Sequence, residues 1–120
     1  MKKKFGLFVL FSSLLLASIS VPAARAQAAP QRIEITAQKF MFNPGEITVK
    51  VGQPVVLVLK SVDVGHGLRI RDVGVDIKVK AGETAEATFT PTKTGDFVGH
   101  CSVFCGSGHG SMVFTLHVVA

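Results

Sequence analysis

Apolar and polar residues alternate along much of the chain after residue 30. Strict alternation over four to eight residues is typical of β-strands that bury one face. A continuous apolar run at 54–59 instead fits a strand buried inside a sandwich. No stretch shows a sustained helical period. The other predicted strands lie at 33–37, 47–51, 75–80, 85–90 and 113–119, and the last of these is rich in β-branched residues.

Turn-forming residues separate these runs. Glycine, proline, asparagine and aspartate favour tight turns, and they occur between the runs at 43–45, 52–54, 81–83 and 94–96. About seven or eight short strands at this regular spacing are typical of a two-sheet sandwich. The sequence therefore predicts an all-β fold, a Greek-key antiparallel β-sandwich or barrel.

The amino-terminal segment has a different composition. Three lysines at 2–4 precede an uncharged stretch at 5–21, and an Ala-x-Ala site ends at Ala26. This order of basic, apolar and small residues is typical of a secretory signal peptide. We expect cleavage of 1–26, which leaves 27–120 as a single domain that is periplasmic or otherwise exported.

Retention of this segment as a membrane anchor is the alternative. An anchor needs roughly 20 strongly apolar residues, and serines interrupt the apolar run. We therefore expect no stable membrane insertion after cleavage. Cleavage also removes 4 of the 13 Lys and Arg residues and none of the 8 acidic residues, so the formal net charge falls from +5 to +1. Such a domain lacks the basic surface that nucleic-acid binding needs, and we expect a monomer.

The candidate chemistry is concentrated before the last predicted strand. Cys101, Cys105, His109 and Met112 follow the spacing Cys-x3-Cys-x3-His-x2-Met, and glycines between them let the loop fold back. Two thiolates, an imidazole and a thioether form a soft donor set, which favours copper over magnesium, calcium or manganese. His66 follows the apolar strand far upstream. Because a Greek-key sandwich gathers distant loops at one end, we expect His66 to meet this loop.

Other interpretations of the same residues stay open. Paired cysteines in an exported protein form a disulfide by default, which would make the domain a metal-free binding module. Met112 also suits a core position at the start of the last strand, and His66 suits a polar loop position. No ligand role is predicted for His100 or His117.

The chain resembles the copper-bearing cupredoxin domain of cytochrome c oxidase subunit II, whose centre is called CuA and also occurs in nitrous oxide reductase. The resemblance covers essentially all of 27–120. It rests on Phe-Met-Phe-Asn-Pro at 40–44, on Asp-Val-Gly-His at 63–66 and on the loop at 101–112. It implies a cupredoxin-like sandwich with copper bound at one end.

The resemblance also implies two copper ions rather than one. In that family two thiolates bridge the copper ions, and each copper binds one imidazole. A mononuclear blue-copper site, the alternative, needs a single thiolate, which would leave Cys101 surplus. The implied ligands are Cys101 and Cys105 as bridges, His66 with the weakly bound Met112 on one copper, and His109 with the backbone carbonyl of Val103 on the other.

Two departures from the oxidase pattern bear on function. Oxidase subunits commonly carry a glutamate where this chain has Val103, and this chain has no Trp and no Tyr. We therefore expect a free-standing electron-transfer protein whose partner is a periplasmic redox protein, such as a c-type cytochrome or a terminal oxidase. A copper carrier that uses the same ligands is the alternative. A fully ligated metal leaves no open position for a substrate, so no enzymatic activity is expected.

Overall fold

The computed structural model describes residue 6, residues 17–22 and residues 29–120. The predicted signal peptide, with its cleavage site after Ala26, lies largely outside the described residues. Within the described part of the chain, none of the helices is long and apolar enough to cross a membrane.

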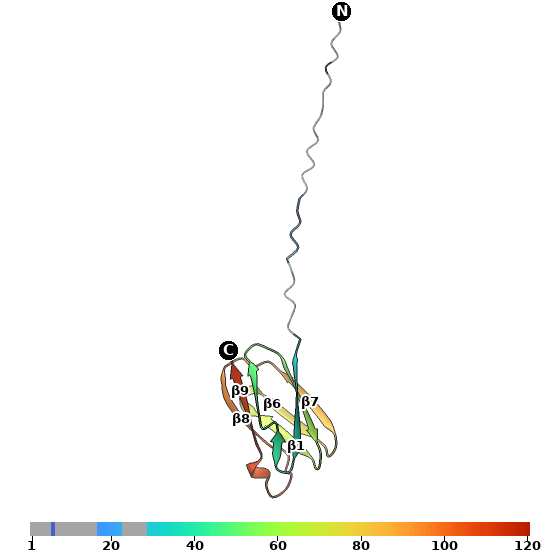
Figure 1. Ribbon diagram of the computed structural model, residues 1–120, viewed down its shortest axis with the longest axis vertical. Coiled ribbons are helices and arrows are strands. Elements are labelled where there is room, and N and C mark those ends of the chain that lie inside the picture. The colour runs from blue at the N-terminus through green and yellow to red at the C-terminus, as the bar shows by residue number, and fades with distance from the viewer. Residues whose placement is uncertain (1–5, 7–16, 23–28) are drawn as a thin grey trace, which may run out of the picture.

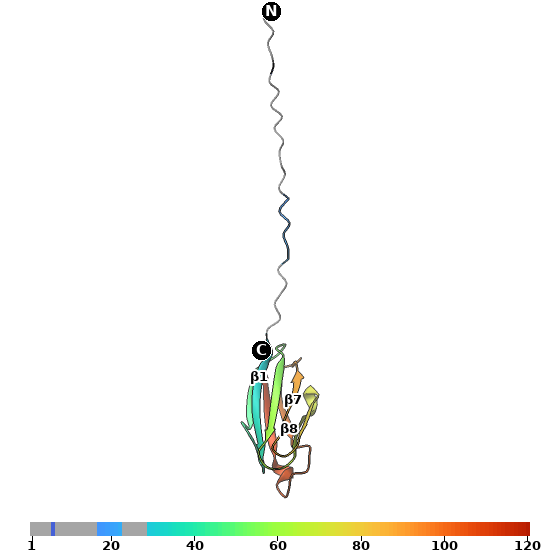
Figure 2. The ribbon, with the colours of Figure 1, turned by 90° about the vertical axis from the view of Figure 1, so that its right-hand side faces the viewer.

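Two sheets pack against each other to form a sandwich (Figures 1 and 2). The four-stranded sheet has the order β2-β1-β4-β7, and the five-stranded sheet has the order β3-β9-β8-β5-β6. The first sheet contains β1 (Gln31–Gln38), β2 (Met41–Asn43), β4 (Val55–Ser61) and β7 (Thr84–Phe89). The second contains β3 (Glu46–Lys50), β5 (His66–Ile70), β6 (Val75–Val79), β8 (Gly95–His100) and β9 (Val113–Val119), and two short 3-10 helices, η1 (Arg71–Val73) and η2 (His109–Ser111), accompany them.

The predicted all-β sandwich is confirmed, and its strand pairing is mixed. Most neighbouring strands are antiparallel, but β1 pairs with β4 and β3 pairs with β9 in parallel. The chain crosses to the other sheet after β2 and returns as β4, so β4 lies beside β1 without a hairpin between them. Parallel neighbours need such a crossover, which explains why the pairing is not antiparallel throughout.

Alternation along the strands builds the core between the sheets. In β9, Phe114, Leu116 and Val118 are buried, while the residues between them are at least partly exposed. The ring of Phe114 meets that of Phe42 edge to face, with centroids 6.0 Å apart. Each large apolar side chain buried in this way stabilises the fold by about 1.5–3 kcal/mol. The two sheets are therefore held by a continuous apolar layer, which fixes the loops at their ends.

The opposite side of β9 carries a polar link across three strands. The ring of His117 contacts Asp96 of β8 through Nδ1 at 2.6 Å and Glu46 of β3 through Nε2 at 3.1 Å. The hydrogen bond with Asp96, followed by that with Glu46, raises the pKa of His117 above its ordinary value. The protonated ring donates to both carboxylates, so it joins β3, β9 and β8.

This link should make stability depend on pH. Because the pKa of His117 is raised in the folded state, its contribution is complete below the unfolded pKa of about 6.5 and is lost as the pH rises through the folded pKa. We expect His117→Gln to lower the urea midpoint of the metal-free protein at pH 6, and to lower it much less at pH 9. An equal loss at both pH values would contradict the charged link.

Candidate metal centre

Backbone hydrogen bonds close the loop between β8 and β9. The N–H of Cys101 donates to the carbonyl of Met112 at 3.1 Å, which joins the two ends of the loop. The N–H of Ser102 donates to the carbonyl of Gly67 at 3.3 Å, which ties the loop to β5. Between Ser102 and Met112 the chain forms the short helix η2. The loop lies at the end of the sandwich away from the carboxyl terminus (Figure 1).

The glycines of this loop pack against an aromatic ring from the turn between β1 and β2. A Cβ atom added at Gly108 would lie 2.4 Å from Cγ of Phe40, which is closer than any real contact. Gly106 has a φ of 133°, which side chains rarely adopt, and its Cβ would lie 3.0 Å from the same ring. Close approach to Phe40 therefore explains why glycine occupies these two positions.

The two cysteines lie side by side. Their sulfurs are 3.7 Å apart, and both thiols are free, whereas a disulfide bond is about 2.05 Å long. The structure therefore does not contain the disulfide that the cysteines alone would suggest. The sulfur of Cys101 also lies 3.9 Å from Nδ1 of His66 and 3.1 Å from the carbonyl oxygen of Val103.

The remaining predicted ligands surround the second cysteine. The sulfur of Cys105 lies 3.7 Å from Nδ1 of His109 and 3.8 Å from Sδ of Met112. The structure thus brings together all six residues that the sequence predicts as ligands. Each thiol has an imidazole nitrogen of its own beside it, and each also has one weaker donor, either a carbonyl oxygen or a thioether.

These separations fit a metal ion between the donor atoms. A first-row metal bonded at about 2.1 Å to imidazole nitrogen and about 2.3 Å to thiolate sulfur allows those two atoms to lie no more than about 4.4 Å apart. The nitrogen-to-sulfur distances of 3.9 Å and 3.7 Å fall within this limit. The donor atoms of His66, Cys101 and Cys105 lie within 4.8 Å of one another, and all three residues are buried. Thiolate, thioether and imidazole donors together suit copper.

Exposure differs between the two sides of the site. His66 and Met112 are fully buried, whereas His109 and Val103 are half-buried. Phe104, in the same loop, is 79% exposed and its ring centroid lies 5.5 Å from that of His109. The site is therefore closed toward the core and approaches the solvent at His109.

Asp63, to which the sequence assigned no role, contacts the buried histidine. Its Oδ1 lies 2.7 Å from Nε2 of His66, on the side of the ring away from the sulfurs. Burial raises the pKa of Asp63, but hydrogen bonds from the N–H of Lys39, from His66 and from the N–H of Val64 outweigh it and lower the pKa to about 2. The carboxylate is therefore charged at neutral pH. In the sequence, only its position three residues before His66 indicated that Asp63 could contact this histidine.

The thiol of Cys105 holds its proton in the metal-free protein. Burial raises the pKa of Cys105, and the hydrogen bond and charge of Cys101 and the charge of Asp63 raise it further. Metal ligation by cysteine requires the thiolate, so a metal that binds Cys105 must displace this proton. Metal affinity should consequently increase with pH.

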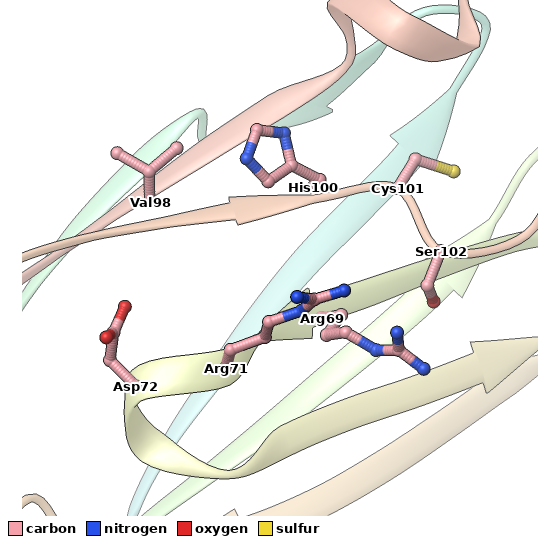
Figure 3. A pocket seen from close by; sticks show the side chains of 7 residues that line it. All are labelled: Arg69, Arg71, Asp72, Val98, His100, Cys101 and Ser102. Atoms are coloured by element: carbon pink, nitrogen blue, oxygen red, sulfur yellow. The ribbon is translucent and has the colours of Figure 1, made fainter.

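A cleft of about 500 Å³ lies beside the site on the outer face of the five-stranded sheet (Figure 3). His100 is exposed at the end of β8, whereas Cys101, directly after the strand, is buried. His100 therefore does not join the other histidines. The cleft is lined by Arg69, Arg71, Asp72, Val98, His100, Cys101 and Ser102.

The sandwich and its sulfur-rich site together define a cupredoxin-type domain. The family model for the Cupredoxin-like domain matches residues 7–114, and the chain belongs to this family. The fold and the family that the sequence predicted are both confirmed.

The curated relatives of this chain include oxidase subunits. Two proteins named cytochrome c oxidase subunit 2, both from Thermus thermophilus, are each 29% identical to this chain over 86 residues, or 72% of its length. The matched region spans 64% and 51% of the lengths of these two relatives. The resemblance to subunit II is therefore confirmed for part of each relative.

Solved structures share the fold. The periplasmic domain of subunit II of cytochrome oxidase (CoxB) from Bradyrhizobium japonicum superposes with a TM-score of 0.68 at 24% identity, covering 74% of this chain and 83% of that one. Auracyanin A, a blue copper protein from Chloroflexus aurantiacus, superposes with a TM-score of 0.64 at 21% identity, covering 76% and 100% of the two chains. Since an oxidase domain and a blue copper protein both share the fold, the number of copper ions must be argued from the site.

Proposed function

We propose that this protein is an exported electron-transfer protein with a dinuclear copper centre of the CuA type. The observation that carries the proposal is the pairing of two buried thiols with two separate imidazoles. Cys101 and Cys105 lie 3.7 Å apart, and their sulfurs face Nδ1 of His66 and of His109, respectively. A mononuclear site needs only one thiolate, whereas two bridging thiolates give both cysteines a role.

The proposed ligands divide between the two positions. Both cysteines would bridge, the copper on the buried side would take His66 with the weakly bound Met112, and the other would take His109 with the carbonyl of Val103. Copper supplies the one-electron chemistry. The chain supplies a donor set that is buried except at Val103 and His109. When fully ligated, it would leave no position for a substrate, so we propose no catalytic activity for the domain itself.

Electron exchange would take place on the solvent side of the site. His109 is half-buried and Phe104 beside it is exposed, so a partner that contacts this end approaches a proposed ligand directly. We propose a periplasmic redox protein as the partner, such as a c-type cytochrome or a terminal oxidase. The relatives named cytochrome c oxidase subunit 2 support this class of partner, and the basic, apolar and small residues of the amino-terminal segment support an exported location.

One measurement tests the number of metals. Copper-loaded protein should contain two copper ions per chain and show the purple absorption of a mixed-valence pair. Removal of copper with a strong chelator should abolish the absorption, and reloading the reduced protein should restore it. A single copper with a blue spectrum would overturn the dinuclear centre, and failure of the reduced protein to bind copper would overturn the metal site altogether.

A copper carrier is the second candidate, favoured by the solvent-facing side of the site. Because His109 is only half-buried, the metal it binds can pass to another protein. A weak competing chelator distinguishes the two functions. Ready loss of copper to it favours a carrier, and retention favours electron transfer.

A further inference from the structure

We propose that Asp63 is a positioning residue that fixes the ring of His66 for metal binding, an inference that rests on the proposed copper site. The carboxylate of Asp63 lies in the loop between β4 and β5 and accepts hydrogen bonds from two directions. Its Oδ2 accepts from the N–H of Lys39 at 2.7 Å, and its Oδ1 accepts from the N–H of Val64 at 2.6 Å. These two backbone donors hold the carboxylate in place independently of His66.

The third contact determines which nitrogen of the His66 ring carries the proton. Oδ1 of Asp63 lies 2.7 Å from Nε2 of His66, and an ionised carboxylate can only accept a hydrogen bond. Nε2 therefore carries the proton of this hydrogen bond, which leaves Nδ1 for a metal. Nδ1 is the nitrogen that faces the sulfur of Cys101, at 3.9 Å. The buried ring is thus held in the one tautomer that can bind a metal beside that sulfur.

The same carboxylate connects the two parts of the centre. The N–H of Lys39 donates to this carboxylate, and Lys39 directly precedes Phe40. The ring of Phe40 packs against Gly106 and Gly108 in the loop that carries the other proposed ligands. One side chain therefore fixes both the upstream histidine and the turn that supports the downstream loop. A loss of Asp63 should loosen both.

The charge of Asp63 should also act on the metal. A carboxylate that accepts from a ligating histidine makes the ring a stronger donor. A stronger donor and a nearby negative charge favour the more positive, oxidised copper. Removal of this charge should therefore raise the reduction potential.

The first test is the effect of Asp63→Asn on metal binding. We expect copper affinity to fall about 10- to 100-fold, measured by competition with a chelator, and the reduction potential to rise. Asp72→Asn is the matched control, because it removes the same charge from η1, at the other end of β5 from His66. A copper affinity of the Asp63 variant within threefold of the control would overturn the proposal, even if the variant were less stable.

The second test needs neither a variant nor copper. Nitrogen-15 NMR of the metal-free, reduced wild-type protein should show the His66 ring protonated at Nε2. A ring protonated at Nδ1 would overturn the positioning role. This result does not depend on the number of copper ions. If the site proved mononuclear, the proposed dinuclear centre would be wrong, but the expected tautomer of His66 would be the same. The Asp63→Asn protein, where it folds, should show a loss of this single tautomer.

Discussion

Replacement of Cys101 by serine should reduce the copper content from two ions per chain to one or none and abolish the mixed-valence absorption. A serine hydroxyl is a poor ligand for copper at neutral pH, so the bridge that Cys101 provides is lost. The sulfur of Cys105 keeps His109 and Met112 beside it, at 3.7 Å and 3.8 Å. These residues, with His66, still offer the thiolate, two imidazoles and axial thioether of a mononuclear site.

Cys105→Ser is the matched comparison. It leaves Cys101 with His66 at 3.9 Å and the carbonyl oxygen of Val103 at 3.1 Å, a poorer set for one copper because it lacks the neighbouring thioether. We expect this variant to bind copper more weakly than Cys101→Ser. Copper analysis and electron paramagnetic resonance of both variants provide the measurement. A persistent dinuclear signal in Cys101→Ser would show that the bridging assignment is wrong.

Alternation in the sequence was enough to predict strands that bury one regular face. The predicted strand at 113–119 coincides with β9, and the one at 75–80 extends β6 by a single residue. In both strands every second residue is an apolar core residue. Local pattern and tertiary burial agree there, so no knowledge of neighbouring strands was needed.

β5 and β8, which lie near the site, were missed because some of their buried positions are not apolar. In β5 the buried residues include His66 and Gly67, which interrupt any apolar pattern. In β8, Gly99 is needed because a Cβ atom there would lie 2.8 Å from Cγ1 of Ile70 in β5. Glycine and histidine are required at these positions by the packing of one strand on another and by the site, and neither requirement can be read from local alternation.

The spacing in the sequence singled out four of the six proposed ligands, but not the residues that support them. The Cys, His and Met positions are close together in the sequence, and their donor chemistry identifies them. Asp63 acts through a hydrogen bond to the far side of the His66 ring. Phe40 acts through contact with loop glycines more than sixty positions away in the sequence. Both roles exist only once the turns and loops meet at one end of the sandwich.

The contact with Phe40 also predicts a large loss of stability for Gly108→Ala. Gly108 has a φ of −93°, which alanine adopts easily, so the substitution is opposed only by its neighbour. The new Cβ would lie 2.4 Å from Cγ of Phe40, and either the ring or the loop must move. Such overpacking costs about 1–3 kcal/mol. We expect a matching loss in the free energy of unfolding of the metal-free protein, together with weaker copper binding.

Gly110→Ala is the control in the same loop. A Cβ at Gly110 meets nothing within 4 Å, and both substitutions restrict the unfolded chain equally. The difference between the two variants in urea unfolding therefore isolates the contact with Phe40. Phe40→Ala should make Gly108→Ala nearly neutral when the two are combined, because the ring that opposes the new methyl group is gone. Equal stabilities of the Gly108 and Gly110 variants would mean that Phe40 does not hold the loop that carries Cys105 and His109.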